Sequence, residues 1–172
     1  MITKAVNTSK SSVILQGYNW NSWKQNKSYF NDLKSKSELI KDTGIDAIWF
    51  PPCSKSVSPQ GYMPLDYYDL NSEYGTKTEL LECIKVFQDK NIDVYGDIVI
   101  NHRCAEFQNN DGVYNVFGGK LAWGDDAIVS NHEKFKGKGN HSNFKIFNAA
   151  PNIDHAQEFV KSDLIELSLI HI

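Results

Sequence analysis

Three short apolar runs mark the first hundred residues, and each is expected to form a strand. They are VILQ at 13–16, IDAIWF at 45–50 and the stretch 92–100. Gly17 ends the first run. Pro51 and Pro52 stop the second, because proline lacks the N–H that a strand ladder needs.

Helical periodicity separates these runs. Residues 29–43 place three apolar side chains on roughly one face, namely Phe30, Leu33 and Ile40, and Gly44 follows as a C-terminal cap. Thr76 and Glu79 have the spacing of a capping box and open a second helix. Alternation of strands with helices predicts parallel β/α units and an α/β fold.

From 103 to 152 the periodicity disappears, and Gly, Asn and His dominate. A loop of this length inside a domain is usually functional or a small subdomain. Residues 156–169 predict one more helix. Three strands alone would leave both sheet edges bare, and 167–172 carry no stop signal, so we expect this chain to be part of a longer protein.

Composition changes this picture little. The chain has 172 residues, of which 41% are hydrophobic and 23% charged, as in ordinary globular proteins. A net charge of −3 gives no sign of a phosphate-binding surface, so no nucleic-acid partner is expected. No stretch approaches the roughly 20 apolar residues of a membrane span, so no membrane partner is expected either.

The cysteines and the N-terminus indicate a reducing compartment. Cys53, Cys83 and Cys104 are too few and too irregularly spaced for a disulfide framework or a metal pair. The first seven residues, MITKAVN, lack the apolar centre of a signal peptide. We expect a cytoplasmic protein, unless a leader is missing from the chain.

The segment DIVINH at 97–102 carries the most informative polar groups. In a strand, Asp97, Val99 and Asn101 share one face, and His102 lies at the C-terminal end, where barrel active sites form. The alternative is structural: a buried Asp97 that caps local backbone and a His102 that faces solvent.

A second candidate is the loop PQGYMPLDYYD at 59–69. Glycine and two prolines fix this loop and display Tyr62, whose ring can pack on the apolar face of a sugar. Tyr62 could equally cover its own loop. The third candidate, APNIDH at 150–155, offers Asp154 to a calcium ion, which prefers oxygen ligands, although an Asp before a helix is more commonly an N-cap.

Five motifs occur in the order of one known family. They are QGYNW at 16–20, QGYMP at 60–64, YGT at 74–76, DIVINH at 97–102 and AAPNIDH at 149–155. Together, from about residue 13 to 167, they resemble the α-amylases of glycoside hydrolase family 13, particularly the plant-type enzymes. The resemblance implies a partial TIM (β/α)8 barrel: the first three β/α units at 1–102, an irregular domain B at 103–154, and the start of the next barrel helix at 155–172.

The same resemblance implies residue roles. Tyr62 matches the aromatic that stacks on the sugar at the cleavage point, and His102 the histidine that hydrogen-bonds it. Asp97 matches a buried carboxylate that organises the site. Asn101 and Asp154 match two ligands of the calcium that ties domain B to the barrel.

Departures from the plant-type pattern bear on calcium. Asn152 replaces an acidic residue, and further acids are missing around Trp123 and Ser142, while Asp126 is a retained candidate ligand. Fewer carboxylates weaken calcium binding, which puts additional calcium sites in doubt.

The resemblance implies an enzyme that cleaves internal α-1,4 bonds of starch, glycogen or malto-oligosaccharides with retention. Retention needs two carboxylates about 5–5.5 Å apart, and the family places them after strands four and five. We expect both to lie beyond this chain, which therefore has no catalytic residue of its own. The alternatives are a non-catalytic carbohydrate-binding remnant and another glucan-active member of family 13.

Overall fold

A computed structural model describes residues 12–25 and 28–170, so the leader expectation for residues 1–7 lies outside the described part. Three strands form a parallel sheet in the order β1-β2-β5. They are β1 (Ile14–Gln16), β2 (Ala47–Phe50) and β5 (Asp93–Gly96). The predicted parallel β/α arrangement is confirmed for these elements, and the fold is α/β.

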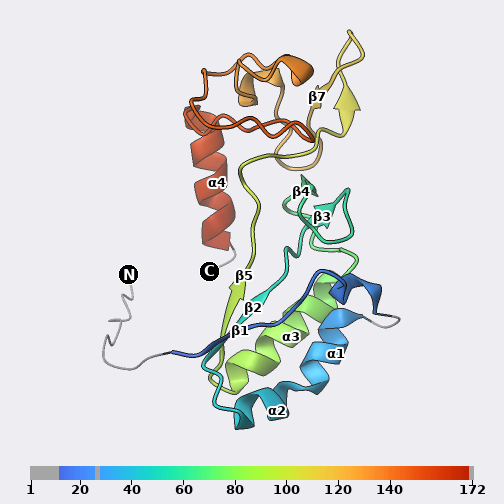
Figure 1. The fold of residues 1–172 in the computed structure, drawn as a ribbon, viewed down its shortest axis with the longest axis vertical. Coiled ribbons are helices and arrows are strands. Elements are labelled where there is room, and N and C mark those ends of the chain that lie inside the picture. Colours follow the sequence, from blue (N-terminus) through green and yellow to red (C-terminus); the bar gives the residue numbers. More distant parts are fainter. Residues whose placement is uncertain (1–11, 26–27, 171–172) are drawn as a thin grey trace.

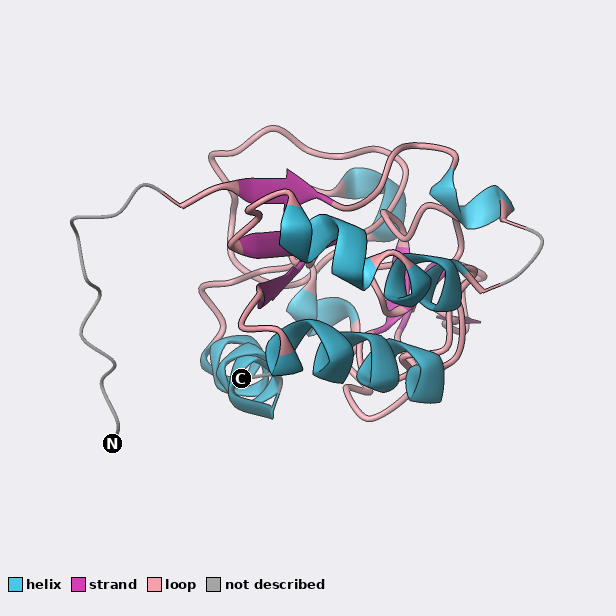
Figure 2. Cartoon of the chain, turned by 90° about the horizontal axis from the view of Figure 1, so that it is seen from below, coloured by secondary structure: helices cyan, strands magenta, loops and turns pink. Residues whose placement is uncertain are grey.

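Three helices cover one face of this sheet (Figures 1 and 2). They are α1 (Tyr29–Ser35), α2 (Ser37–Asp42) and α3 (Lys77–Asp89). Phe30, Ile48 and Phe87 are fully buried between sheet and helices, in the first of two hydrophobic clusters. Alternate strand residues supply this cluster, because side chains on a strand point to opposite faces in turn.

The single helix expected at 29–43 is wrong, because the chain forms two helices that meet at Lys36. The Lys36 N–H bonds to the Leu33 carbonyl three residues earlier, at 3.1 Å, and the Ser35 hydroxyl bonds to the Asp32 carbonyl at 2.7 Å. Serine side chains compete for helical carbonyls in this way and favour a break. The expected cap is present, since Gly44 follows the C-cap residue Thr43 of the second helix and has φ +79°.

The strand expected at 92–100 is too long, because β5 ends at Gly96. A parallel strand continues only while its neighbour does, and β2 stops at Phe50, before the two prolines. The Asp97 N–H makes the last bond across, to the Phe50 carbonyl at 3.1 Å. The alternation of Asp97, Val99 and Asn101 on a strand face is therefore wrong, and these residues lie in irregular chain.

The remaining elements form the upper part of Figure 1, apart from the 3-10 turn at Ser22–Lys24, which lies near α1. They are the hairpin β3 (Lys55–Ser56) and β4 (Pro64–Asp66), the hairpin β6 (Phe107–Gln108) and β7 (Tyr114–Val116), the 3-10 turns η1 (Ser22–Lys24), η2 (Asp125–Ala127) and η3 (Glu133–Phe135), and the helix α4 (Glu158–Ile170). A second hydrophobic cluster joins the irregular region to α4 through Phe117, Ile128 and Val160. The helix expected at 156–169 is confirmed with its start two residues later.

Arg103 lies inside this second part with no exposed surface. Its guanidinium donates to three carbonyls, those of Leu65 at 2.9 Å, Leu121 at 2.6 Å and Gly118 at 2.7 Å. Three rings surround it with centroids at 5.1–5.4 Å, those of Tyr67, Phe117 and Trp123. Arg103 thus ties β4 to the irregular region, and burial lowers its pKa.

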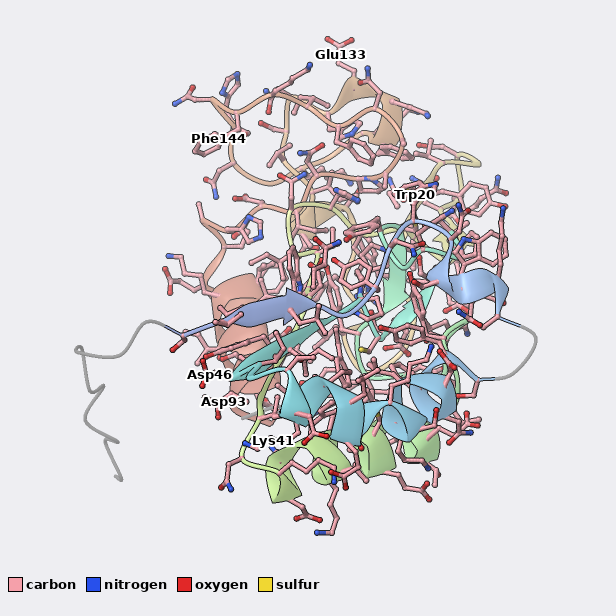
Figure 3. The ribbon with its side chains drawn as sticks, turned by 60° about the horizontal axis from the view of Figure 1, so that its bottom comes forward. Trp20, Lys41, Asp46, Asp93, Glu133 and Phe144 are labelled. Atoms are coloured by element: carbon pink, nitrogen blue, oxygen red, sulfur yellow. The ribbon has the colours of Figure 1, made fainter. Side chains whose placement is uncertain are left out.

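The sheet face opposite the helices is open in the described residues. Ile14, Trp49 and Tyr95 point to it and are 56%, 37% and 53% exposed. Figure 3 shows Asp46 and Asp93 together at one end of the sheet and Trp20 towards the other. No helix in the described part is long and apolar enough to cross a membrane.

Candidate functional site

The loop that displays Tyr62 depends on a glycine. Gly61 has φ +88°, a left-handed conformation that other residues rarely adopt, and it follows a turn closed by its N–H to the Ser58 carbonyl at 3.0 Å. A Cβ at Gly61 would lie 2.6 Å from the Pro52 carbonyl oxygen. Only glycine lets the loop pack so closely against the end of β2, which brings Tyr62 beside the sheet.

Tyr62, Tyr18 and Asp97 meet at the C-terminal ends of the strands. The Asp97 Oδ2 accepts from the Tyr18 hydroxyl at 2.8 Å and from the Tyr62 hydroxyl at 3.0 Å, and the two hydroxyls lie 2.8 Å apart. An ionised carboxylate brings no proton, so two protons serve three contacts. At any moment one contact is therefore unbonded, and the cluster can re-form its bonds when a ligand arrives.

Burial raises the pKa of Tyr18, and its hydrogen bonds to Tyr62 and Asp97 add to the rise. Burial raises the pKa of Tyr62 as well. Both hydroxyls stay protonated at neutral pH and act as donors. Asp97 is half-buried rather than buried as expected, because it follows β5, the edge strand of the described sheet.

His102 bonds directly to the Tyr62 loop. Its Nε2 lies 2.9 Å from the Tyr62 carbonyl oxygen, and its Nδ1 lies 3.3 Å from the Asn101 side-chain nitrogen. A carbonyl only accepts and an amide nitrogen only donates, so in these contacts Nε2 is the donor and Nδ1 the acceptor. A sugar hydroxyl that bonds Nε2 has to share or replace the Tyr62 carbonyl.

Two aromatic contacts frame this group. The Trp20 ring, 64% exposed, lies parallel to the Tyr62 ring, with centroids 6.2 Å apart and planes 9° apart. The Phe147 ring stacks on the imidazole of His102 with centroids 4.1 Å apart. Exposed rings around a cluster of donors are the side chains that sugar-binding surfaces use, because a sugar has apolar faces and a hydroxyl rim.

The expected calcium ligands lie on neighbouring segments. The Asn101 carbonyl accepts from the Ile153 N–H at 3.0 Å, and His155 Nε2 contacts the Ile100 carbonyl at 2.9 Å. Asp154 between them is 3% exposed. The structure thus brings the backbones at Asn101 and Asp154 together across the junction with the irregular region.

Oxygens also converge on Gly139. A Cβ there would lie 2.5 Å from the Asp154 Oδ2, 2.7 Å from the Ile128 carbonyl and 3.0 Å from the Asp126 carbonyl. The Asp126 Oδ1 would lie 3.3 Å from a Cβ at Gly124, so the oxygen of Asp126 that is seen beside Gly139 is its carbonyl. In the described residues, no three His, Cys, Asp or Glu side chains are grouped as metal ligands would be.

Asp154 also has the alternative role of a backbone cap. Its carboxylate accepts from the backbone N–H and side-chain amide of Asn140 and from the Ala156 N–H. These bonds close the loop before α4, but Asp154 is not the N-cap of that helix, because α4 begins at Glu158 and the bonded N–H groups lie before it. Capping and metal binding are compatible, because a carboxylate has about four acceptor positions.

Sequence reasoning missed Tyr18 and Phe147. Tyr18 lies in the QGYNW motif directly after β1, and its place at a strand's C-terminal end is a signal that could have found it. Phe147 lies in irregular chain, where no periodicity shows which side chains meet. Only the fold reveals its contact with His102.

Comparison with known proteins finds similar sequences and a similar fold. Two relatives are Alpha-amylase 3, chloroplastic, from Arabidopsis thaliana, 48% identical over 154 residues, and a 4-alpha-glucanotransferase from Thermotoga maritima, 38% identical over 73 residues. These matches cover 90% and 42% of this chain. A solved trehalose-6-phosphate hydrolase from Bacillus licheniformis shares the fold, with a TM-score of 0.63 at 20% identity over 92% of this chain and 32% of its own.

The chain spans only part of these relatives, 17% of the Arabidopsis protein and 17% of the Thermotoga protein. Residues 21–148 match the family described as Alpha amylase, catalytic domain. This chain belongs to the alpha-amylase catalytic domain family.

Proposed function

We propose that the protein containing these residues hydrolyses internal α-1,4 bonds of starch, glycogen or malto-oligosaccharides with retention. In this proposal the chain forms the first three units of a (β/α)8 barrel and carries the sugar-binding side of its cleft. The observation that supports it most is the joint placement of Tyr62, Asp97 and His102 at the C-terminal ends of parallel strands, where barrel enzymes bind substrate.

In this proposal Tyr62, His102 and Asp97 each have a separate role. Tyr62 packs its ring on the sugar at the cleavage point, and His102 donates from Nε2 to a hydroxyl of that sugar. Asp97 holds the hydroxyls of Tyr62 and Tyr18 in place. The attacking and proton-donating carboxylates come from outside these residues, because Asp97 is already bonded by two phenols and serves as an organiser.

Another glucan-active enzyme is the second candidate, supported by the glucanotransferase relative. A non-catalytic carbohydrate-binding remnant is the third. The natural gene product is here the protein that contains these residues, as its gene encodes it. Incubating it with maltoheptaose distinguishes the three candidate functions. Shorter oligosaccharides with one new reducing end for each bond cleaved support hydrolysis. Longer products without a gain in reducing ends support transfer, and binding without any product supports the remnant.

Calcium fits the residues at the junction. Asp154 is a buried carboxylate that forms no ion pair within the described residues, and a buried charge is costly without a partner. Asn101 and Asp154 would hold the ion, with carbonyl oxygens such as that of Asp126 close by. Calcium would supply positive charge that ties the irregular region to the sheet. A cytoplasmic location is likewise proposed, from the sequence alone.

A further inference from the structure

Phe147 makes the closest ring contact in the described part of the chain, and it makes it with His102. The centroids are 4.1 Å apart and the planes differ by 28°, which is a stacked arrangement. Phe147 is 37% exposed, so burial alone does not explain its position. The ring covers one face of the imidazole that the proposed function assigns to sugar binding.

The backbone of Phe147 is held from both sides. Its N–H donates to the Asn152 Oδ1 at 2.7 Å, and its carbonyl lies 3.2 Å from the Nε2 of His132. Asn152 and His132 are 5% and 1% exposed, so both anchors are themselves fixed in the interior. Asn152 also pairs with His102 in an isolated antiparallel bridge.

These contacts hold His102 both at its ring face and at its ring edge. One segment, 147–152, provides the ring above the imidazole and the backbone partner beside it, and the Tyr62 carbonyl and Asn101 side chain meet the ring edge. An imidazole with edge contacts alone can still tilt out of its plane. A ring stacked on its face removes that freedom, and small errors of placement are costly in catalysis.

We propose that Phe147 is a positioning residue, which fixes the plane of His102 so that its Nε2 stays at the Tyr62 carbonyl, where a sugar hydroxyl bound beside Tyr62 can share that contact. This inference rests on the proposed function and adds to it a residue from the irregular region. It acts through His102 and needs no contact of its own with the sugar.

The test uses the natural gene product with three variants. Phe147→Leu keeps an apolar side chain and removes the ring plane, and Phe147→Tyr keeps the ring. Phe144→Leu is the matched control, since Phe144 lies three residues earlier in the same loop, is 84% exposed and points outward in Figure 3. The readouts are kcat and KM on maltoheptaose and the NMR resonances of the His102 ring protons, assigned with His102→Gln.

We expect Phe147→Leu to lower kcat about 10- to 100-fold with a smaller change in KM. It should also move the His102 ring resonances, because the ring current of Phe147 is lost. Phe147→Tyr should keep most of the kcat of the unsubstituted protein, and Phe144→Leu should change neither kcat nor the His102 resonances.

Two results overturn the inference. Unchanged His102 resonances in Phe147→Leu show that the rings do not stack, and changed resonances with unchanged kcat show that the stack is not used. A natural gene product that binds and cleaves no α-glucan instead overturns the proposed function, and with it the catalytic role of Phe147. The NMR comparison reports separately on the stack.

Discussion

A carboxylate shared by two phenols governs the residue-scale behaviour of this site. Asp97 accepts from Tyr18 and Tyr62 through the same oxygen, Oδ2. Because burial raises the pKa of both phenols, the carboxylate faces donors throughout the neutral range. Asp97 is thereby kept as an acceptor, and Tyr62 is kept in one orientation with its ring beside Trp20.

Removing Tyr62 or His102 should damage turnover more than folding. In the natural gene product, Tyr62→Ala and His102→Ala should each lower kcat/KM at least about 100-fold, since a stack or an oriented hydrogen bond to the sugar is lost where errors of placement are costly. The free energy of unfolding, measured with urea, should fall by no more than about 1.5 kcal/mol. Tyr114→Ala, at an exposed tyrosine on β7, is the control. Near-native kinetics in both variants would return these residues to structural roles.

Replacing Arg103 should lower stability more than turnover, because the hydrogen bonds of its side chain in the described residues all go to other parts of the protein. Arg103→Met would remove a donor from three carbonyls, those of Leu65, Leu121 and Gly118, and within the described residues Leu121 alone would keep a second donor, the Trp123 N–H at 2.9 Å. Each carbonyl left unsatisfied costs about 1–3 kcal/mol. We expect the free energy of unfolding to fall by about 3 kcal/mol or more. Lys85→Met, at an exposed ion pair, should change it by less than about 0.5 kcal/mol. A loss at Arg103 as small as that at Lys85 would contradict this assignment.

At the scale of elements, the sequence predicted the features that a local motif or the apolar pattern shows, and missed those that neither shows. The capping box at Thr76 was predicted correctly, because both partners lie within one helical turn. The length of β5 was wrong, because Pro51 and Pro52 set it from the neighbouring strand. The break at Lys36 was missed, since the bonds of Ser35 are local but do not disturb the apolar pattern.

The capping box at Thr76 should contribute to the free energy of unfolding. Thr76→Ala should lower the free energy of unfolding by about 1 kcal/mol, because the Glu79 N–H loses its side-chain partner. Thr78→Ala, two residues on and exposed on the same helix, is the control and should be nearly neutral. Equal losses in the two variants, measured by urea unfolding, would show that the cap contributes nothing specific.

The same element predicts a pH dependence. The Thr76 N–H lowers the pKa of Glu79 in the folded state. A lowered folded pKa means that Glu79 stabilises the protein above its unfolded pKa of about 4.3, and that this contribution disappears as pH falls through the folded pKa. The stability difference between the unsubstituted protein and Glu79→Gln should be present at pH 7 and shrink below about pH 4. A difference that is constant over this range would exclude the carboxylate as its source.

At the scale of the whole molecule, two hydrophobic clusters meet along a polar junction. Tyr62, Asp97 and His102 were predicted to gather there, and they do, because strand ends in a parallel sheet share one edge. Tyr18 and Phe147 were not assigned, since their contacts join residues 44 and 45 positions apart in the chain. Such pairs become visible only when the fold brings them together.

Calcium should stabilise the junction. In the natural gene product, excess chelator should lower the melting temperature, because an ion bound only to the folded state contributes about 2.7 kcal/mol at 100 times its Kd. Asp154→Asn should lower the melting temperature less than chelator does, because it keeps part of the hydrogen bonding to the backbone and removes the buried charge. Chelator should then have no effect on the melting temperature of this variant. A melting curve that is unchanged by chelator would contradict the calcium proposal.

The open sheet face predicts how the 172-residue chain behaves alone. Ile14, Trp49 and Tyr95 expose apolar surface, and β1 and β5 each present an unpaired edge in the described sheet. Both features favour association of chains. We expect no stable monomer and no starch hydrolysis from this chain by itself. A sharp unfolding transition of a purified monomer would contradict the first expectation, and release of reducing ends that follows the monomer peak would contradict the second.

The anomeric form of the first product tests the central proposal most directly. The natural gene product is mixed with maltoheptaose, and the new anomeric protons are followed by NMR before the products mutarotate. Hydrolysis with retention at the site of Tyr62, Asp97 and His102 predicts that the α-anomer appears first, and that Tyr62→Ala slows its appearance at least about 100-fold. Initial appearance of the β-anomer, or a rate unaffected by Tyr62→Ala, would contradict the account.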